Sequence, residues 1–383
     1  MSNILITGGR APVALELARA FHRAGHSVFM AESLRGHLSQ PSAAVKTNFV
    51  VPAPRQETGA FLATLKKIIE QNQIELLIPT CEEVFHIAKG LDDLPCRVFT
   101  EPLAKLDSFH NKWKFAFSAA ECRLRVPDTM LIRNQSDLLD AFGRWRGLVL
   151  KPVYSRFASR TLILPQLRDV LSTLTFASPW VAQEFIAGQQ FCAYSVCQSG
   201  RITAHATYPT IFTAGQGATI AFQHVEHPEI FNWVRTFVER NNVTGQMSFD
   251  FIQSEDGQVH ALECNPRATS GLHLLASHPQ FVESFFSAEP ADPVTPLENK
   301  KMLASAMLIY DLPTAVANGT FRAWLETFLH SDDVIFDVKD LLPFLLQFRS
   351  FLFYLRLARQ KGISPLEAST FDIEWNGESF TAM

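Results

Sequence analysis

The hydrophobic positions of the first hundred residues change period several times. Short continuous apolar runs alternate with longer segments in which apolar residues recur at helical spacing. The runs are residues 3–9, 27–33, 74–80 and 96–100, and the helical segments are residues 12–26, 59–72 and 82–91. Strands that alternate with helices predict a parallel sheet covered by helices. We therefore expect a doubly wound α/β domain over residues 1–104.

After residue 104 strand-like segments begin to follow one another directly. This pattern predicts an α+β domain with mostly antiparallel strands over residues 105–295. Its expected helices are residues 108–122 and 228–242, and its expected extended segments are residues 126–132, 147–152, 179–186, 189–200 and 201–212. Residues 296–383 form a C-terminal accessory region that we expect to be helical, with a helix near residues 341–359.

The stretch "FDFIQSEDGQVHALEC" predicts a β-hairpin, because two apolar segments flank Asp256-Gly257, a typical hairpin loop. If those two residues form the loop, Phe251 faces Leu262 on an apolar face. On the other face, the same register places Asp250 opposite Glu263.

Two facing acids need an explanation. At a separation of about 4 Å and an effective dielectric constant near 20, Asp250 and Glu263 repel by about 4 kcal/mol when both are charged. A divalent cation between them removes this repulsion, and Mg²⁺ prefers such oxygen ligands. Asn265 offers an amide oxygen on the same face, and Arg267 can hold an anion with two hydrogen bonds. The alternative is a solvent-facing hairpin with scattered charges.

Two lysines complete a candidate phosphate site. Lys112 lies in "HNKWKF", and Lys151 ends the apolar strand "LVLKP". A lysine at the end of a buried strand is unusual unless it has an anionic partner.

The order Lys112, Lys151, "VAQEFIAGQQF", "FDFI" and "ALECNPR" resembles the ATP-grasp superfamily, over roughly residues 1–290. The resemblance implies an ATP- and Mg²⁺-dependent ligase that activates a carboxylate as an acyl phosphate. An amine or a similar nucleophile then displaces phosphate. The implied partners are therefore a small-molecule carboxylate and an amine.

The resemblance also implies roles for individual residues. Lys112 and Lys151 contact the ATP phosphates, and Arg267 acts with Lys151 in catalysis. Residues that line the adenine are Gln183, Glu184, Phe185 and Ile186, and the ligands of Mg²⁺, or alternatively Mn²⁺, are Asp250, Glu263 and Asn265.

Two positions depart from the usual family pattern. Gln190 stands where the family usually has a glutamate that binds the ribose. The phosphate-covering loop "KPVYSRFASRT" contains no glycine, so we expect it to be stiff. Its polar residues that can bind phosphate instead are Ser155, Arg156 and Ser159.

Two further features have two interpretations each. The glycine loop around Gly215 and Gly217 either covers the acceptor site or only connects two strands. Glu82 and Glu83 either cap a helix or face the cleft between the first two domains.

Composition narrows the class of protein. The chain has 383 residues and a net charge of -4, which gives no basic field for nucleic acid. Six cysteines without a CxxC pair indicate reduced thiols in the cytoplasm, and the N-terminus does not resemble a signal peptide. Residues 341–359 contain a proline, a glutamine and three arginines, too many interruptions for a transmembrane helix. We expect this helix to pack on the body; the alternative is contact with a second copy, another partner or a membrane surface.

Two other functions compete with the ligase. One is a non-catalytic nucleotide-binding or interaction protein on the same fold. The other is a nicotinamide oxidoreductase, in which Glu32 would hold a ribose. The turn "GGRAPVA" lacks the GxGxxG fingerprint, which argues against the oxidoreductase.

Overall fold

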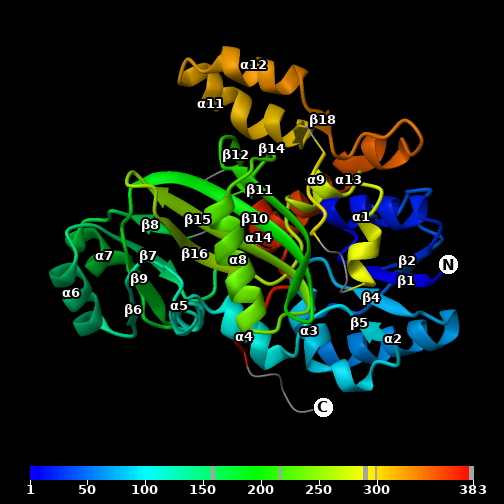
Figure 1. Ribbon diagram of the computed structural model, residues 1–383, viewed down its shortest axis with the longest axis horizontal. Coiled ribbons are helices and arrows are strands. Elements are labelled where there is room, and N and C mark those ends of the chain that lie inside the picture. The colour runs from blue at the N-terminus through cyan, green and yellow to red at the C-terminus, as the bar shows by residue number, and fades with distance from the viewer. Residues whose placement is uncertain (157–159, 215–217, 288–291, 298–299, 379–383) are drawn as a thin grey trace.

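The computed structural model describes residues 1–156, 160–214, 218–287, 292–297 and 300–378. Figure 1 shows three regions along the long axis, with the parallel N-terminal sheet at one end and a small antiparallel sheet at the other. A larger antiparallel sheet lies between them. This arrangement agrees with the predicted mixture of α/β and α+β structure and a helical C-terminal region.

The N-terminal region is a five-stranded parallel sheet in the order β3-β2-β1-β4-β5. Its strands are β1 (Asn3–Thr7), β2 (Ser27–Glu32), β3 (Thr47–Val50), β4 (Leu76–Ile78) and β5 (Arg97–Val98). The helices are α1 (Pro12–Arg23), α2 (Thr58–Asn72) and α3 (Glu83–Lys89), followed by the 3-10 turn η1 (Leu91–Asp93). The sequence did not predict β3, a short edge strand with two polar residues.

Both faces of this sheet are covered, because neighbouring residues of each strand point to opposite sides. Ile4 and Ile6 pack toward α1, whereas Leu5 packs toward α2. The N-terminal region is therefore doubly wound.

The next region has a four-stranded antiparallel sheet in the order β6-β9-β7-β8. Its strands are β6 (Thr129–Ile132), β7 (Leu148–Pro152), β8 (Leu162–Ile163) and β9 (Trp180–Glu184), and its helices are α6 (Gln135–Arg144) and α7 (Leu167–Thr173). The single helix predicted for residues 108–122 is two helices, α4 (Leu103–His110) and α5 (Lys112–Glu121). Asn111 separates them, because its side chain accepts hydrogen bonds from the first amides of α5. This break places Lys112 at the start of a helix.

The central sheet is antiparallel in the order β11-β10-β15-β16. Its strands are β10 (Gly188–Gln198), β11 (Arg201–Pro209), β15 (Gly245–Ser254) and β16 (Val259–Asn265). Helix α8 (Pro228–Arg240) covers one face, where Trp233 and Phe237 pack on Phe249 and Phe251. The other face is left for the candidate site.

The turn between β15 and β16 is one residue longer than predicted. Ser254 N donates to Gln258 O at 2.9 Å, so residues 255–257 form a three-residue loop. Gly257 takes φ 82°, the left-handed conformation that such loops require.

A β-bulge then corrects the register. Phe251 pairs with Ala261 rather than with Leu262, but Asp250 pairs with Glu263, as predicted. Leu262 is the extra residue between these two pairs. Because the longer turn and the bulge each shift the pairing by one position, their effects cancel at the two acids.

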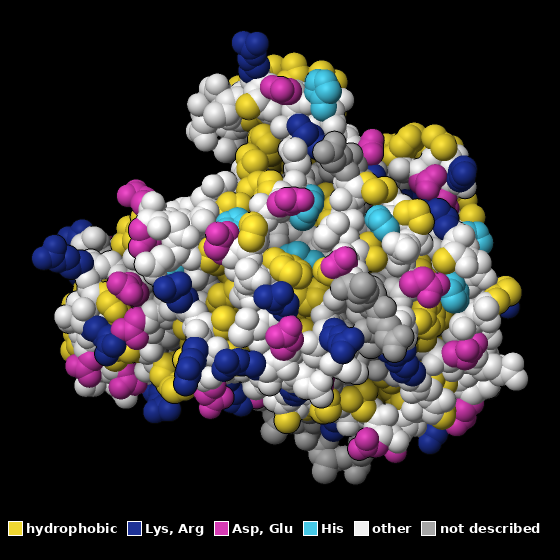
Figure 2. Space-filling model, viewed as in Figure 1, with side chains coloured by type: hydrophobic (Ala, Val, Ile, Leu, Met, Phe, Trp, Pro, Cys, Tyr) yellow, Lys and Arg dark blue, Asp and Glu magenta, His cyan; other side chains and the backbone are white. Residues whose placement is uncertain are grey.

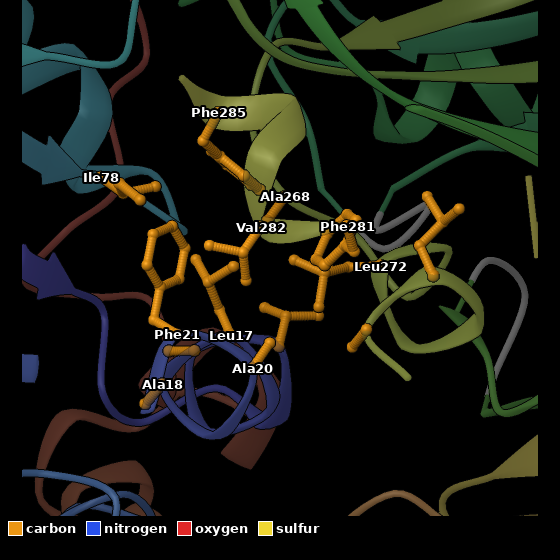
Figure 3. Close-up of a cluster of buried hydrophobic side chains, with 14 of the residues drawn as sticks. Leu17, Ala18, Ala20, Phe21, Ile78, Ala268, Leu272, Phe281, Val282 and Phe285 are labelled. Atoms are coloured by element: carbon orange, nitrogen blue, oxygen red, sulfur yellow. The ribbon is translucent and has the colours of Figure 1, made fainter. Parts of the chain in front are cut away.

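One hydrophobic core joins the N-terminal and central regions (Figure 3). Leu17 and Phe21 of α1 pack against Leu272 of α9 (Leu272–Leu275) and against Phe285 of η2 (Val282–Phe285). This packing fixes the N-terminal sheet next to the chain that follows β16, and so fixes one wall of the cavity described below.

The C-terminal region contains several helices and shares one small sheet with the preceding region. This sheet has the order β14-β17-β18, from β14 (Ala221–Gln223), β17 (Lys300–Met302) and β18 (Asp332–Asp333). The short strands β12 (Thr213–Ala214) and β13 (Ala218–Thr219) form a separate ladder. The helices are α10 (Ala304–Ala306), η3 (Met307–Asp311), α11 (Leu312–Ala317), α12 (Phe321–Leu329), α13 (Leu342–Lys361) and α14 (Pro365–Ala368). Helices α11 and α12 project from the body (Figure 1).

Helix α13 contacts the body along a narrow strip. Only Pro343, Ser350 and Ala358 are buried among its described residues, and Ser350 donates a hydrogen bond to Gly36 O. Its exposed apolar residues are Leu342, Leu345, Leu346, Phe348, Leu352 and Phe353. Figure 2 shows hydrophobic side chains gathered on the projecting helices and over the segment leading into α13. Within the described chain, no helix has both the length and the apolar composition for a membrane span.

Candidate functional site

A cavity of about 550 Å³ lies between the two antiparallel sheets and extends to the N-terminal sheet. The residues predicted for the site that line it are Lys151, Gln183, Glu184, Phe185, Ile186, Gln190, Asp250, Glu263, Asn265 and Arg267. Lys112 is buried beside them and contacts Glu263. The structure therefore brings the predicted residues to one place.

The acid pair lies on the open face of the central sheet. Asp250 of β15 and Glu263 of β16 are cross-strand partners, and Asn265 follows Glu263 on the same strand. In the described chain, no group of three or more His, Cys, Asp or Glu side chains surrounds a common metal position. Any cation at this pair would therefore take further ligands from Asn265, from water or from a substrate.

Two lysines surround the acid pair. Lys112 Nζ lies 3.1 Å from Glu263 Oε2 and 3.2 Å from Ser155 O. Lys151 lies on β7 with its side chain buried toward the same two acids. Burial lowers the pKa of Lys151, and Glu263 opposes this effect.

The electrostatics of the pair are asymmetric. Burial, and then the negative charge of Glu263, raise the pKa of Asp250 to about 7. Burial acts in the same direction on Glu263, but Lys112 and Lys151 outweigh it and hold its pKa below the usual range. Without a cation, the pair therefore favours one shared proton near neutral pH.

The end of the cavity near β9 is mostly apolar. Val149, Ile163 and Leu262 line it in addition to the predicted residues. Sequence reasoning missed these three, and Leu262 reaches the cavity only through the bulge. Gln183 is buried here, and its Oε1 has no hydrogen-bond partner in the described structure, although Nε2 donates to Thr129. A flat ring with an amino group at its edge would fill this space and pair with that oxygen.

The loop after Lys151 is held by the C-terminal segment. Arg156 binds Glu82, donates to Trp375 O at 2.6 Å and donates to Asn376 at 2.9 Å. Its guanidinium is thus engaged by protein groups and does not point to a free phosphate position, contrary to the interpretation from sequence. Ser155 is buried, and its carbonyl oxygen accepts a hydrogen bond from Lys112. Ser159 and the glycines of the 213–222 segment, Gly215 and Gly217, lie outside the described residues.

Glu82 and Glu83 differ in environment. The Glu83 carboxylate is buried and accepts hydrogen bonds from Thr7 and from the amides of Thr80 and Cys81. Glu82 makes no side-chain cap of α3, but it lines the cavity. Of the two interpretations, a helix cap or a residue that faces the cleft, the second therefore describes Glu82.

Arg267 and Glu82 lie next to each other on the cavity wall. Arg267 Nη2 lies 3.8 Å from Glu82 Oε1, and Nη1 donates to Ala268 O at 3.1 Å. Glu82 Oε1 is buried without a hydrogen-bond partner among the described residues. Both groups thus retain hydrogen-bonding capacity toward the cavity.

Glu32 is committed to a structural ion pair. Arg10 donates to Glu32 through Nε, Nη2 and the backbone amide, and it also binds Asp372 at 2.5 Å. Burial raises the pKa of Glu32, but Arg10 outweighs this and lowers it. A glutamate held in this way has no free oxygen directed at a ribose, which argues further against the oxidoreductase.

Sequence reasoning also missed the wall that the C-terminal region supplies. Tyr354, Ser369, Thr370 and Ile373 line the cavity near the N-terminal sheet. No motif marks these residues, and their position follows from long-range ion pairs such as Arg10–Asp372 and Arg55–Glu374.

Comparison with known proteins agrees with this geometry. Residues 109–271 match the family model described as the ATP-grasp domain. This segment contains the acid pair, both lysines and the predicted adenine-lining residues. Residues 109–271 form an ATP-grasp domain. No curated protein matches this chain.

Solved structures of ATP-grasp enzymes share the fold beyond this domain. N5-carboxyaminoimidazole synthetase from Staphylococcus aureus, complexed with ADP, is 11% identical with a TM-score of 0.64, covering 83% of this chain and 86% of that chain. Phosphoribosylamine–glycine ligase from Thermotoga maritima is 16% identical with a TM-score of 0.59 and 78% of each chain covered. L-amino acid ligase from Bacillus licheniformis is 14% identical with a TM-score of 0.59, covering 72% of this chain and 70% of that chain. At these identities the likeness establishes the fold alone.

The residues of the ATP-grasp domain fit a metal-bound nucleotide. The carboxylates of Asp250 and Glu263 and the amide of Asn265 are the oxygen ligands that Mg²⁺ prefers. The unpartnered oxygen of Gln183 suits the amino group of an adenine. Lys112 and Lys151 supply positive charge beside the acid pair.

Proposed function

We propose that this protein is an ATP- and Mg²⁺-dependent ligase that joins a carboxylate to an amine. First, a carboxylate oxygen bonds to the γ-phosphorus of ATP as the bond from that phosphorus to the ADP oxygen breaks. Next, the amine nitrogen bonds to the acyl carbon, phosphate leaves with the electrons of the C–O bond, and the nitrogen loses a proton. The products are an amide, ADP and phosphate.

The observation that carries the proposal is the opposed pair Asp250–Glu263 with two buried lysines beside it. A buried cluster of two acids and two cations is costly unless each charge has a partner. Magnesium bound to phosphate oxygens gives the acids a cation and the lysines an anion.

Each residue has a proposed role. Lys112 and Lys151 bind phosphate oxygens, and Lys151 also neutralises charge during transfer. Gln190 binds a ribose hydroxyl through its carbonyl. Arg267 grips the transferring phosphoryl group or the acyl phosphate with two N–H groups. The proposed adenine-lining residues are Gln183, Glu184, Phe185 and Ile186, and the proposed Mg²⁺ ligands, which also suit Mn²⁺, are Asp250, Glu263 and Asn265.

A phosphate-release screen over carboxylates and amines tests the activity directly. We expect phosphate release from MgATP that depends on one carboxylate–amine pair and stops when EDTA removes the metal. Calorimetry with MgATP alone accompanies the screen. ATP binding without turnover over a broad screen would contradict the ligase assignment.

That outcome would support the second candidate, a non-catalytic nucleotide-binding protein. Its support is that residues 151–161 contain no glycine and that Arg156 is bound to Glu82 and the C-terminal segment. Arg156 is therefore less free to move toward phosphates.

We propose that residues 1–104, 105–295 and 296–383 act as three parts of this ligase. We also propose a cytoplasmic location, supported by six cysteines that are all free thiols.

The exposed apolar face of α13 supports a contact with a second copy or with another protein. Sedimentation of the double variant Leu345→Gln/Leu352→Gln tests this contact. We expect the unmodified chain to sediment as a dimer and the variant as a monomer. If the unmodified chain and the variant both sediment as monomers, the proposed homodimer is wrong.

A further inference from the structure

We propose that the carboxylate substrate is an α-amino acid with an uncharged side chain, whose ammonium group binds Glu82 and whose carboxylate binds Arg267. The inference rests on the proposed ligase function and deepens it by naming the substrate class. The observation behind it is that Glu82 and Arg267 lie side by side on the cavity wall and both can make further hydrogen bonds.

Glu82 has one satisfied oxygen and one open oxygen. Its Oε2 binds Arg156, whereas Oε1 is buried without a hydrogen-bond partner in the described chain. Glu82 lines the cavity and is only 2% exposed. A buried carboxylate oxygen without a partner is costly, so a ligand that donates a hydrogen bond there is favoured. A positively charged donor is favoured most.

Arg267 places a positive charge close to the negative charge of Glu82. Its Nη2 lies 3.8 Å from Glu82 Oε1, which is too long for a hydrogen bond. Both groups can therefore bind a ligand without first breaking a strong contact. An α-amino acid carries an ammonium and a carboxylate on a single carbon, so one molecule can reach both.

Other charged groups at this end are already paired. Arg10 is bound to Glu32 and Asp372, and Arg156 is bound to Glu82 and the C-terminal segment. A carboxylate without an ammonium would find Arg267 but would leave Glu82 Oε1 without a partner.

The neighbouring wall carries apolar and small polar side chains. Val13 of α1 and Ile373, Ser369 and Thr370 of the C-terminal segment line the cavity. Ile373 precedes the residues that hold Arg156, and Arg156 holds Glu82. A side chain that extends from the α-carbon therefore meets hydrocarbon and hydroxyl groups rather than a free charge.

Binding by Glu82 also decides which amine reacts. An ammonium held by a carboxylate keeps its proton and is not a nucleophile. The amino acid therefore supplies only its carboxyl group, and a separate amine attacks the acyl phosphate. The product retains a free α-amino group.

Hydroxylamine trapping tests the proposal without knowledge of the natural amine. Each L-amino acid is incubated with MgATP and hydroxylamine, and the hydroxamate and released phosphate are measured. The matched substrates are the corresponding carboxylic acids that lack the amino group. We expect an amino acid with an uncharged side chain to give hydroxamate at least about 100-fold faster than its desamino analogue, because a site built for a polar group rejects a ligand without it.

Variants at Glu82 separate substrate recognition from nucleotide binding. Glu82→Gln should raise the KM for the amino acid at least tenfold while the Kd for MgATP stays unchanged. Glu82→Asp, which keeps the charge, should recover part of the KM, and Glu255→Gln on the exposed turn is the matched control.

Equal rates with desamino acids, or an unchanged KM in Glu82→Gln, would overturn the inference. So would MgATP binding with no hydroxamate from any amino acid, and a wider carboxylate screen would then judge the ligase function separately. Absence of MgATP binding would overturn the ligase function itself, and this inference with it.

Discussion

Lys112 Nζ lies 3.1 Å from Glu263 Oε2, and Lys112 is the first residue of α5. The same ammonium donates to Ser155 O, in the loop that follows β7. One lysine thus connects a helix start, the phosphate-side loop and the acid pair. Under the proposed function, Glu263 would bind Mg²⁺, and Lys112 would then be available to bind a phosphate oxygen.

Removing the charge of Glu263 should weaken MgATP binding. We expect Glu263→Gln to raise the Kd for MgATP at least tenfold, about 1.4 kcal/mol, because the amide is a poor Mg²⁺ ligand. Titration calorimetry at fixed Mg²⁺ measures the change, and Glu255→Gln is the control. An unchanged Kd would remove Glu263 from the metal site.

Lys151 should contribute to binding the ATP phosphates. Lys112 stays paired with Glu263 in Lys151→Ala, so we expect the fold to persist. Because one proposed phosphate-binding cation is lost, we expect the Kd for ATP to rise about tenfold, about 1.4 kcal/mol. The control is Lys114→Ala, whose ammonium is half exposed and paired with Asp107. Calorimetry reads the binding, and circular dichroism checks the fold. If Lys151→Ala binds ATP as tightly as the unmodified protein, the cavity is not a phosphate site.

Arg267 should act in the chemical step. Arg267→Ala is expected to keep the MgATP Kd within a few fold and to lose about 10²–10³ in turnover, because the guanidinium stabilises charge that develops on the transferring group. Arg267→Lys should rescue poorly, since it supplies charge without two parallel donors. Single-turnover phosphate release measures the rate. A near-normal rate in Arg267→Ala would assign this residue to pairing with Glu82 alone.

The Arg10–Glu32 pair should contribute to stability. Glu32→Ala leaves a buried arginine with Asp372 as its remaining acidic partner, so we expect a loss of about 3–5 kcal/mol in the free energy of unfolding. Urea unfolding followed by circular dichroism measures it, with Asp92→Ala as the surface control. A loss equal to that of the control would show that Arg10 and Asp372 suffice.

His205 should make stability depend on pH. Burial lowers its pKa to about 3, and its ring nitrogens contact Ser195 and Thr207. Below pH 6.5 the unfolded chain takes up a proton at His205 that the folded chain does not, so stability falls as the pH drops toward 3. His205→Gln removes this dependence. Unfolding at pH 7 and pH 4.5 should show a smaller difference in the variant, and equal differences in both proteins would refute the assignment.

The acid pair was predictable because it depends on local pattern. Alternation along two strands and a turn signal placed Asp250 opposite Glu263, although the turn itself has three residues rather than two. The bulge at Leu262 compensated for that error. No residue type in the segment marks the bulge, so the sequence could not show that Leu262 enters the cavity.

The end of the cavity near the N-terminal sheet was not predictable for a different reason. Arg10 is held by Asp372, and Arg156 by the backbone of Trp375. These partners are separated by hundreds of residues, and no sequence pattern connects them. From the sequence alone, Arg156 is a cation in a phosphate loop, and only the fold shows that its donors are already used.

The ion pair between Arg10 and Asp372 also sets an order of events during synthesis. The two residues leave the ribosome 362 positions apart, a delay of roughly tens of seconds at typical elongation rates. The nascent chain already contains both lysines and the acid pair when the segment bearing Ile373 has not yet been translated. The part of the cavity proposed to bind the nucleotide can therefore form before the part proposed to bind the carboxylate substrate. A message truncated before codon 372 would encode the proposed nucleotide site with an incomplete wall on the substrate side.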